Sequence, residues 1–197
     1  MVFLCMVYAG MAELADVQDL GSCAVRRAGS SPVARTKADR SNYDAWAELG
    51  FAGTVAHNSL VGMGREEDWA CHVMEHELSA IYDVAHGAGL AVLTPAWMEY
   101  ACKDNIPMFV QFAVNVMGVE GSFRTPEAII AEGIDRLRVF FARMSLPKTL
   151  AELGIPEDKL EEMAKKATGI AFGEEEPIGG LKTLTWQDVL AIYQAVK

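Results

Sequence analysis

Apolar side chains recur every three or four positions along most of the chain from residue 41 onward, which is the periodicity of an amphipathic α-helix. In the clearest case, Ile130, Ile134, Leu137 and Phe141 fall on one helical face. No stretch combines sustained alternation of apolar and polar residues with turn residues on both sides. The pattern therefore predicts an all-α fold of seven or eight helices with no β-sheet.

Capping residues divide this pattern into separate helices. Asp104 or Asn105 can cap a helix that has Pro107 in its first turn, and Thr185 has Asp188 three residues on, so both places have the chemistry of a helix start. The segment after His86 is apolar on all sides, which indicates a buried helix. Pro95 inside that segment is expected to kink or end the helix, because proline lacks the backbone N–H donor.

Residues 1–38 differ from the rest of the chain. Their apolar positions are scattered and lead into a Gly-Ser-Ser-Pro turn cluster with mixed charge. A chain of 197 residues suits one substantial core and is short for two domains. We therefore predict a poorly ordered N-terminal segment over residues 1–38 and a single helical domain over residues 39–197.

Composition and charge limit the classes of partner and compartment. The net charge of −10 argues against a nucleic-acid or anionic-membrane partner. The four cysteines show no CxxC pairing, so neither a disulfide framework nor a zinc knuckle is predicted, and the chain is expected to be cytoplasmic. The apolar opening covers only ten residues, far below the roughly 20 that cross a bilayer, which favours neither a signal peptide nor a membrane anchor.

Three of the four histidines lie in the stretch WACHVMEHELSAIYDVAHGAGL, residues 69–90. His72 and His76 are four apart and share one helical face. On one unbroken helix His86 would lie about 21 Å from His72, too far for one ion to bind both. If the two share a metal, the helix must end near residues 82–85 and His86 must open the next segment. Gly87 and Gly89 would permit such a reversal.

Two other interpretations of this stretch stay open. A histidine on a helix is commonly an ordinary polar or packing residue. Alternatively, His72, Glu75 and His76 form H-x-x-E-H, the inverted zincin motif, in which two histidines bind Zn²⁺ and the glutamate is the general base of a peptidase. That motif leaves His86 and the glycines after it without a role.

A longer resemblance accounts for all three histidines. The chain is similar to the C-terminal helical domain of the iron-containing, metal-dependent alcohol dehydrogenases, particularly the butanol-dehydrogenase-like branch. The residues that carry the resemblance are NYDAWAELGFAGTVAHNSLVGMGREEDWACHVMEHELSAIYDVAHGAGLAVLTPAWMEY, then LPKTLAELGIPEDKLEEMAKKA and LTWQDVLAIY. Together these segments extend the resemblance over about residues 40–197.

The resemblance implies reversible hydride transfer between an alcohol or aldehyde and NAD(P), with a bound metal ion as Lewis acid. It implies that His72 and His86 are metal ligands. It also implies that His76 lies beside the nicotinamide and the substrate without binding the metal, as a proton-relay or positioning residue. Imidazole and carboxylate ligands suit Fe²⁺ and Zn²⁺ equally, so the ligand set does not fix the metal.

The chain also departs from the family pattern. The family's other two metal ligands, an Asp and a His four apart, have no counterpart here, because Asp68 is better interpreted as a carboxylate at a helix start. No strand, glycine-rich turn and helix follow one another in the order that a nucleotide-binding unit requires. We therefore expect weak metal binding and no activity from this chain alone.

A non-enzymatic alternative follows from these departures. The chain could be a stranded helical domain that folds without catalytic function. Its exposed apolar surface would then favour aggregation or pairing into a homo-oligomer.

The possible codons of residues 9–36 suggest a genetic origin for the N-terminal segment. Gly29-Ser30-Ser31-Pro32 can be encoded by GGT TCA AGT CC, which resembles the T-arm of a transfer RNA gene, and Ala34-Arg35-Thr36 can be encoded by GCC CGC ACC, which resembles the end of an acceptor stem. We hypothesise that residues 9–36 are a translated leucine tRNA gene.

Sequencing the DNA across codons 9–40 checks this hypothesis. We expect an intact tRNA gene that runs in frame into the dehydrogenase-like codons. Codon choices that break the pairing of the acceptor stem would refute it.

Overall fold

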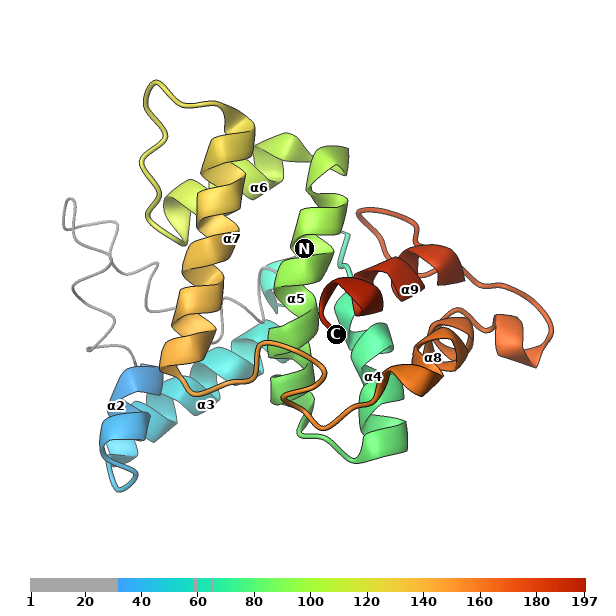
Figure 1. The fold of residues 1–197 in the computed structure, drawn as a ribbon. Helices are drawn as coiled ribbons and strands as arrows, with labels where there is room; N and C mark the ends of the chain where they lie inside the picture. The colour runs from blue at the N-terminus through green and yellow to red at the C-terminus, as the bar shows by residue number, and fades with distance from the viewer. Residues whose placement is uncertain (1–31, 59, 65) are drawn as a thin grey trace. The chain divides into compact units, whose positions relative to one another are not determined.

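The computed structural model describes residues 32–58, 60–64 and 66–197. These residues contain eight α-helices (Figure 1) and no strand beyond one isolated bridge between Ile178 and Leu184, which confirms the all-α prediction. The helices are α2 (Pro32–Ala38), α3 (Tyr43–His57), α4 (Ala70–Tyr82), α5 (His86–Ala101), α6 (Ile106–Asn115), α7 (Pro126–Arg143), α8 (Leu160–Ala167) and α9 (Trp186–Ala195). None of the helices described is long and apolar enough to span a membrane.

Helix α2 lies within the segment predicted to be poorly ordered. It packs against α3, Arg35 forms an ion pair with Glu48, and Thr36 is buried. These contacts stabilise a short helix at the end of the segment, and the poor order of residues 1–38 stays a prediction. Residues 1–31 lie outside the described residues, and the domain boundary after residue 38 stays a prediction.

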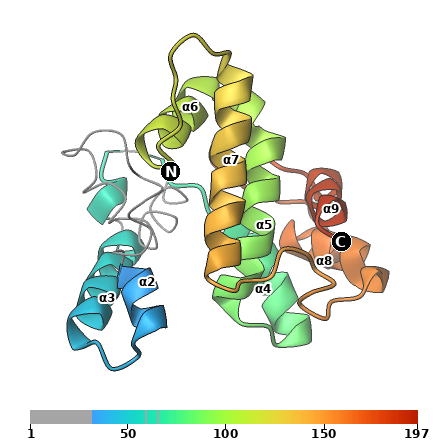
Figure 2. The same cartoon turned by 60° about the vertical axis from the view of Figure 1, so that its left-hand side comes forward.

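The described residues divide into two compact units. The first contains the residues up to 67 together with Asn105–Leu137, and the second contains Asp68–Asp104 and Arg138–Lys197. In the second unit α4 and α5 form a helical hairpin, α8 packs against α4, and α9 packs against both α5 and α8 (Figure 2). The buried Tyr193 on α9 donates its hydroxyl to the carbonyl of Met74 on α4 at 2.7 Å, which ties the last helix to the hairpin.

The turn of the α4–α5 hairpin lies where the histidine spacing requires it. Helix α4 ends at Tyr82, and Asp83 takes the left-handed conformation with φ 52°. The expected use of Gly87 and Gly89 for the reversal is wrong, because both lie inside the first turns of α5. Asp83 can replace a glycine there because a short polar side chain tolerates this backbone region better than most.

Pro95 lies inside helix α5 and does not end it. The helix continues past Pro95 to Ala101. Leu93, Trp97 and Met98 around the proline are at most 2% exposed. This packing offsets the roughly 3 kcal/mol that an interior proline costs a helix.

Asp68 links two parts of the second unit that are distant in sequence. One carboxylate oxygen accepts the backbone N–H of Ala70 at 2.9 Å, which fits its predicted place at a helix start. The other accepts the N–H groups of Gly180 and Leu181 at 3.0 and 2.8 Å. The side chain of Asp68 is buried, so these three donors replace the water it loses.

In the first unit, α6 and α7 approach closely where Ala113 of α6 meets Gly133 of α7. Of the two predicted caps, Asp104 and Asn105, it is Asn105 that caps α6 by accepting the N–H of Met108. A Cβ atom at Gly133 on α7 would lie 2.5 Å from the Cβ of Ala113 on α6. Both positions are buried, so the two backbones meet where neither helix carries a large side chain.

Large apolar side chains are exposed in the first unit. Tyr43 is 80% exposed and Phe51 72% exposed on α3, and Met63 is 71% exposed. This is the kind of surface that the non-enzymatic alternative requires. Pairing of this chain with itself through such a surface stays a prediction.

We expect Gly133→Ala to lower the free energy of unfolding by about 1–3 kcal/mol, because the added methyl group overlaps Ala113. Gly53→Ala on α3 is the matched control, since a Cβ there meets nothing within 4 Å and alanine is the better helix former. Urea unfolding followed by circular dichroism measures both. Equal stability of the two variants would contradict close packing of α6 on α7.

Candidate functional site

Three histidines gather at the end of the α4–α5 hairpin. His72 and His76 lie one turn apart on α4, and His86 is the first residue of α5. The ring centroids are 5.3 Å apart for His72 and His86, 5.5 Å for His76 and His86, and 6.5 Å for His72 and His76. The reversal after Tyr82 therefore brings together residues that an unbroken helix would separate.

The three rings differ in exposure. His72 is buried at 6% exposure, with its ring in edge contact with Trp69 at 4.9 Å, whereas His76 and His86 are exposed. His76 stacks on His86 with an angle of 29° between the ring planes. The cluster thus has one imidazole set into the protein and two on its accessible side.

Glu75 also belongs to the cluster. The sequence analysis gave it a role only in the peptidase interpretation, as the general base. Its side chain is completely buried on α4. One carboxylate oxygen accepts the hydroxyl of Ser79 at 2.5 Å, and the other is hydrogen-bonded to Nδ1 of His86. Glu75 therefore connects the two helices of the hairpin directly behind the histidines.

Gly89 on α5 makes room for this carboxyl group. A Cβ atom at Gly89 would lie 2.6 Å from both Cγ and Oε1 of Glu75. Gly87, in the same helix, has nothing within 4 Å of the corresponding position. Gly89 therefore leaves the space that the side chain of Glu75 fills, whereas Gly87 has no such neighbour.

The geometry of the cluster is compatible with a metal ion. Two imidazoles that share a tetrahedral ion through bonds of about 2.1 Å have ring centroids about 5 Å apart. The His72–His86 and His76–His86 separations both agree with this value. In addition, donor atoms of Glu75, His76 and His86 all lie within 4.8 Å of one another. The separations alone do not select His72 over His76 as the partner of His86, so the predicted ligand roles stay predictions.

The peptidase interpretation does not fit the position of Glu75. A general base must reach the water molecule that it activates. Glu75 has no exposed surface, and its two oxygens are engaged by Ser79 and His86. The structure therefore gives Glu75 a role inside the hairpin rather than at an open catalytic position.

Two other titratable groups lie close in sequence to the histidines. Burial raises the pKa of the Glu77 carboxyl, and nearby Lys166 and His76 partly oppose this shift. Burial, together with the neighbouring Asp68, raises the pKa of the Cys71 thiol well above its usual value. Burial therefore disfavours the thiolate form of Cys71, which is the form that acts as a nucleophile.

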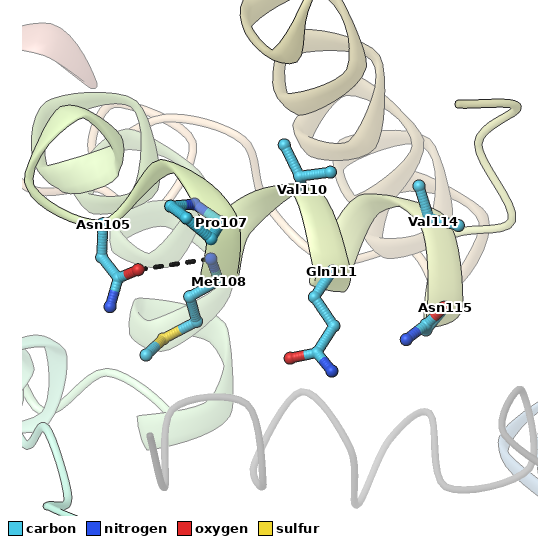
Figure 3. A pocket seen from close by; sticks show the side chains of 7 residues that line it. All are labelled: Asn105, Pro107, Met108, Val110, Gln111, Val114 and Asn115. Atoms are coloured by element: carbon cyan, nitrogen blue, oxygen red, sulfur yellow. Dashed lines mark hydrogen bonds between the residues drawn. The ribbon is translucent and has the colours of Figure 1, made fainter. Parts of the chain in front are cut away.

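The first unit has a cavity of about 570 Å³ along one side of α6 (Figure 3). Its lining residues are apolar or amides: Asn105, Pro107, Met108, Val110, Gln111, Val114 and Asn115. None of these side chains titrates near neutral pH or is a strong nucleophile. This cavity therefore lacks the groups for acid–base or covalent chemistry, which the histidine cluster contains.

The described residues thus form an all-helical fold in which the reversal between α4 and α5 gathers three imidazoles. The profile described as Fe-containing alcohol dehydrogenase family, C-terminal, matches residues 24–197. The chain belongs to the iron-containing alcohol dehydrogenase family, an oxidoreductase family, and represents its C-terminal part.

Similar proteins and structures agree with this membership. NADH-dependent butanol dehydrogenase A of Clostridium acetobutylicum is 42% identical over 163 residues, which are 82% of this chain and 40% of that protein. An NADPH-dependent aldehyde reductase of Escherichia coli is 32% identical over 64% of this chain and 32% of its own length. The crystal structure of NADH-dependent butanol dehydrogenase A from Thermotoga maritima superposes with a TM-score of 0.75 at 31% identity, covering 86% of this chain and 44% of that one. The chain thus spans less than half the length of these relatives.

We expect Gly89→Ala to lower the free energy of unfolding by about 1–3 kcal/mol, because the methyl group displaces the side chain of Glu75. Gly87→Ala, two residues earlier in α5, adds the same methyl group to open space and should not destabilise the protein. Thermal unfolding of the two variants beside the wild type measures the difference. Equal melting temperatures for the two variants would show that Gly89 does not accommodate Glu75.

Proposed function

We propose that this chain provides the metal-binding side of the active site of an NAD(P)-dependent alcohol dehydrogenase. The reaction is reversible hydride transfer between a primary alcohol or aldehyde and a nicotinamide cofactor. The observation that carries the proposal is the convergence of His72 and His86, with ring centroids 5.3 Å apart, in a chain of this family. The butanol dehydrogenases among its relatives support a small primary alcohol or aldehyde as the substrate.

His72 and His86 would hold the metal ion. Their nitrogen donors suit Fe²⁺ and Zn²⁺ alike, and they fill two positions of a four-coordinate site. A bound ion acts as a Lewis acid, which stabilises an alkoxide or polarises a carbonyl. The burial of His72 and the accessibility of His86 would let the protein fix one ligand firmly while the substrate approaches from the side of the other.

His76 would act on the substrate side of the metal without binding it. Its ring is exposed and stacks on His86, so it lies beside a ligand and faces solvent. A neutral imidazole in that place can accept and donate a proton as an alcohol is oxidised or an aldehyde is reduced. We therefore assign His76 to proton relay or substrate positioning.

The cofactor choice stays open between NAD and NADP. Two of the relatives are named for NADH and one for NADPH. This chain spans 40% of the length of the Clostridium acetobutylicum relative, so the activity of a whole protein is proposed here and not that of residues 32–197 alone. That the isolated chain is inactive, and that it resides in the cytoplasm, are predictions from its sequence.

A chimera tests the proposal. It joins residues 39–197 to the part of the Clostridium acetobutylicum butanol dehydrogenase that they do not replace. We expect this chimera to oxidise NADH in the presence of butyraldehyde and Fe²⁺ or Zn²⁺. His72→Ala and His86→Ala should each lower the rate roughly a thousandfold, because Lewis-acid catalysis contributes several kcal/mol.

The amount of metal bound to each purified, folded chimera variant shows whether a substitution removes a metal ligand or disrupts the fold. His57→Ala, at the exposed end of α3, should retain the bound metal of the parent chimera, and His76→Ala should retain it with reduced turnover. A folded, metal-loaded His86→Ala chimera with unchanged turnover would refute the proposed ligand role.

A further inference from the structure

The hydrogen bond between Glu75 and His86 determines which nitrogen of His86 is available to a metal. Nδ1 of His86 is bonded to a carboxylate oxygen of Glu75. If the carboxylate oxygen is the acceptor in this bond, Nδ1 carries the hydrogen. The lone pair of the neutral imidazole is then on Nε2.

The surroundings of Glu75 favour this one arrangement. The carboxyl group is completely buried, and its other oxygen accepts the hydroxyl of Ser79 at 2.5 Å. The missing side chain at Gly89 leaves the space that the carboxyl group fills. Glu75 is therefore confined between α4 and α5, and His86, at the first position of α5, is bonded to a side chain that has little room to move.

We propose that Glu75 is a positioning residue that fixes His86 as the Nδ1–H tautomer, with Nε2 directed to the metal. This inference rests on the proposed metal-binding role of His86. A carboxylate that accepts the second ring N–H of a metal-bound histidine orients the ring and makes it a stronger ligand. The adjacent residues Glu75 and His76 would thus have different roles: Glu75 orients the ring of His86, and His76 acts on the substrate side of the metal.

The competing assignment makes Glu75 a direct metal ligand. Its oxygen lies within 4.8 Å of donor atoms of His76 and His86, which alone would permit shared coordination. However, Glu75 and Nδ1 of His86 are bonded to each other, and a metal between them would replace that bond. The complete burial of Glu75 also favours a hydrogen bond to the ligand His86 over direct contact with the metal.

The tautomer of His86 in the metal-free protein tests whether Glu75 fixes the ring, and the Zn²⁺ affinity of variants separates this role from direct coordination. In the ¹⁵N-histidine-labelled 197-residue chain, nitrogen chemical shifts report the tautomer at a pH where the imidazole is neutral. We expect the Nδ1–H form in the wild type. Glu75→Met, which fills similar space without a carboxylate, should shift His86 to a mixture rich in the Nε2–H form. Glu75→Gln should retain Nδ1–H, because its amide oxygen still accepts.

Zn²⁺ affinity, measured by competition with a chromophoric chelator, gives the second readout. Glu75→Met should weaken binding about 10–100-fold, the usual effect of losing an outer carboxylate. Glu75→Gln should have a smaller effect, since it keeps the hydrogen bond and loses only the charge. Glu127→Met is the matched control, because it makes the same replacement at an exposed position of α7 and should leave both tautomer and affinity unchanged.

Each outcome addresses one proposal. An unchanged Nδ1–H tautomer in Glu75→Met, or a loss of Zn²⁺ binding as complete as in His86→Ala, overturns the positioning role. Should Glu75→Met lose its helical circular dichroism, the tautomer of Glu75→Gln decides, and a mixture there overturns the proposal. If Zn²⁺ affinity is unchanged in His72→Ala and His86→Ala, the proposed metal site is refuted instead. The tautomer of His86 in the metal-free chain still tests the role of Glu75 in that case.

Discussion

The α4–α5 hairpin depends on a carboxyl group enclosed between its two helices. Burying a carboxylate is costly unless hydrogen-bond donors replace the water that it loses. Ser79 on α4 and His86 on α5 are those donors, and Gly89 provides the volume. Because the donors come from both helices, the contact that stabilises Glu75 also determines where His86 lies relative to His72. Folding of the hairpin and assembly of the imidazole cluster are therefore one event.

Much of the fold follows from local chemistry that a sequence displays. The N-cap at Asn105 and the capping box at Thr185 and Asp188 lie where their spacing predicts, because cap bonds involve residues only three apart. The end of α4 at Tyr82 also agrees with the spacing of the histidines. Pro95 shows the limit of local rules, since tertiary packing around α5 overrides the preference of a single residue.

The candidate site was predictable only where it depends on residues close together in the sequence. His72 and His76 share a helical face by spacing alone, whereas the pairing of Glu75 with His86 requires the return path of the chain. One signal did exist: Glu75 falls on the same helical face as Cys71 and Leu78, which are buried, so it is a charged residue on an apolar stripe. Such a residue needs a partner on another element, and periodicity does not identify which one.

The bond from Asp68 to Gly180 and Leu181 has a consequence for the order of folding. It closes a loop of 112 residues, whereas the bond between Glu75 and His86 spans only 11. The entropy cost of closure grows with loop length, so the hairpin can form long before the segment near residue 180 docks. The entropy of loop closure therefore favours formation of the hairpin before the entrance to α4 is completed.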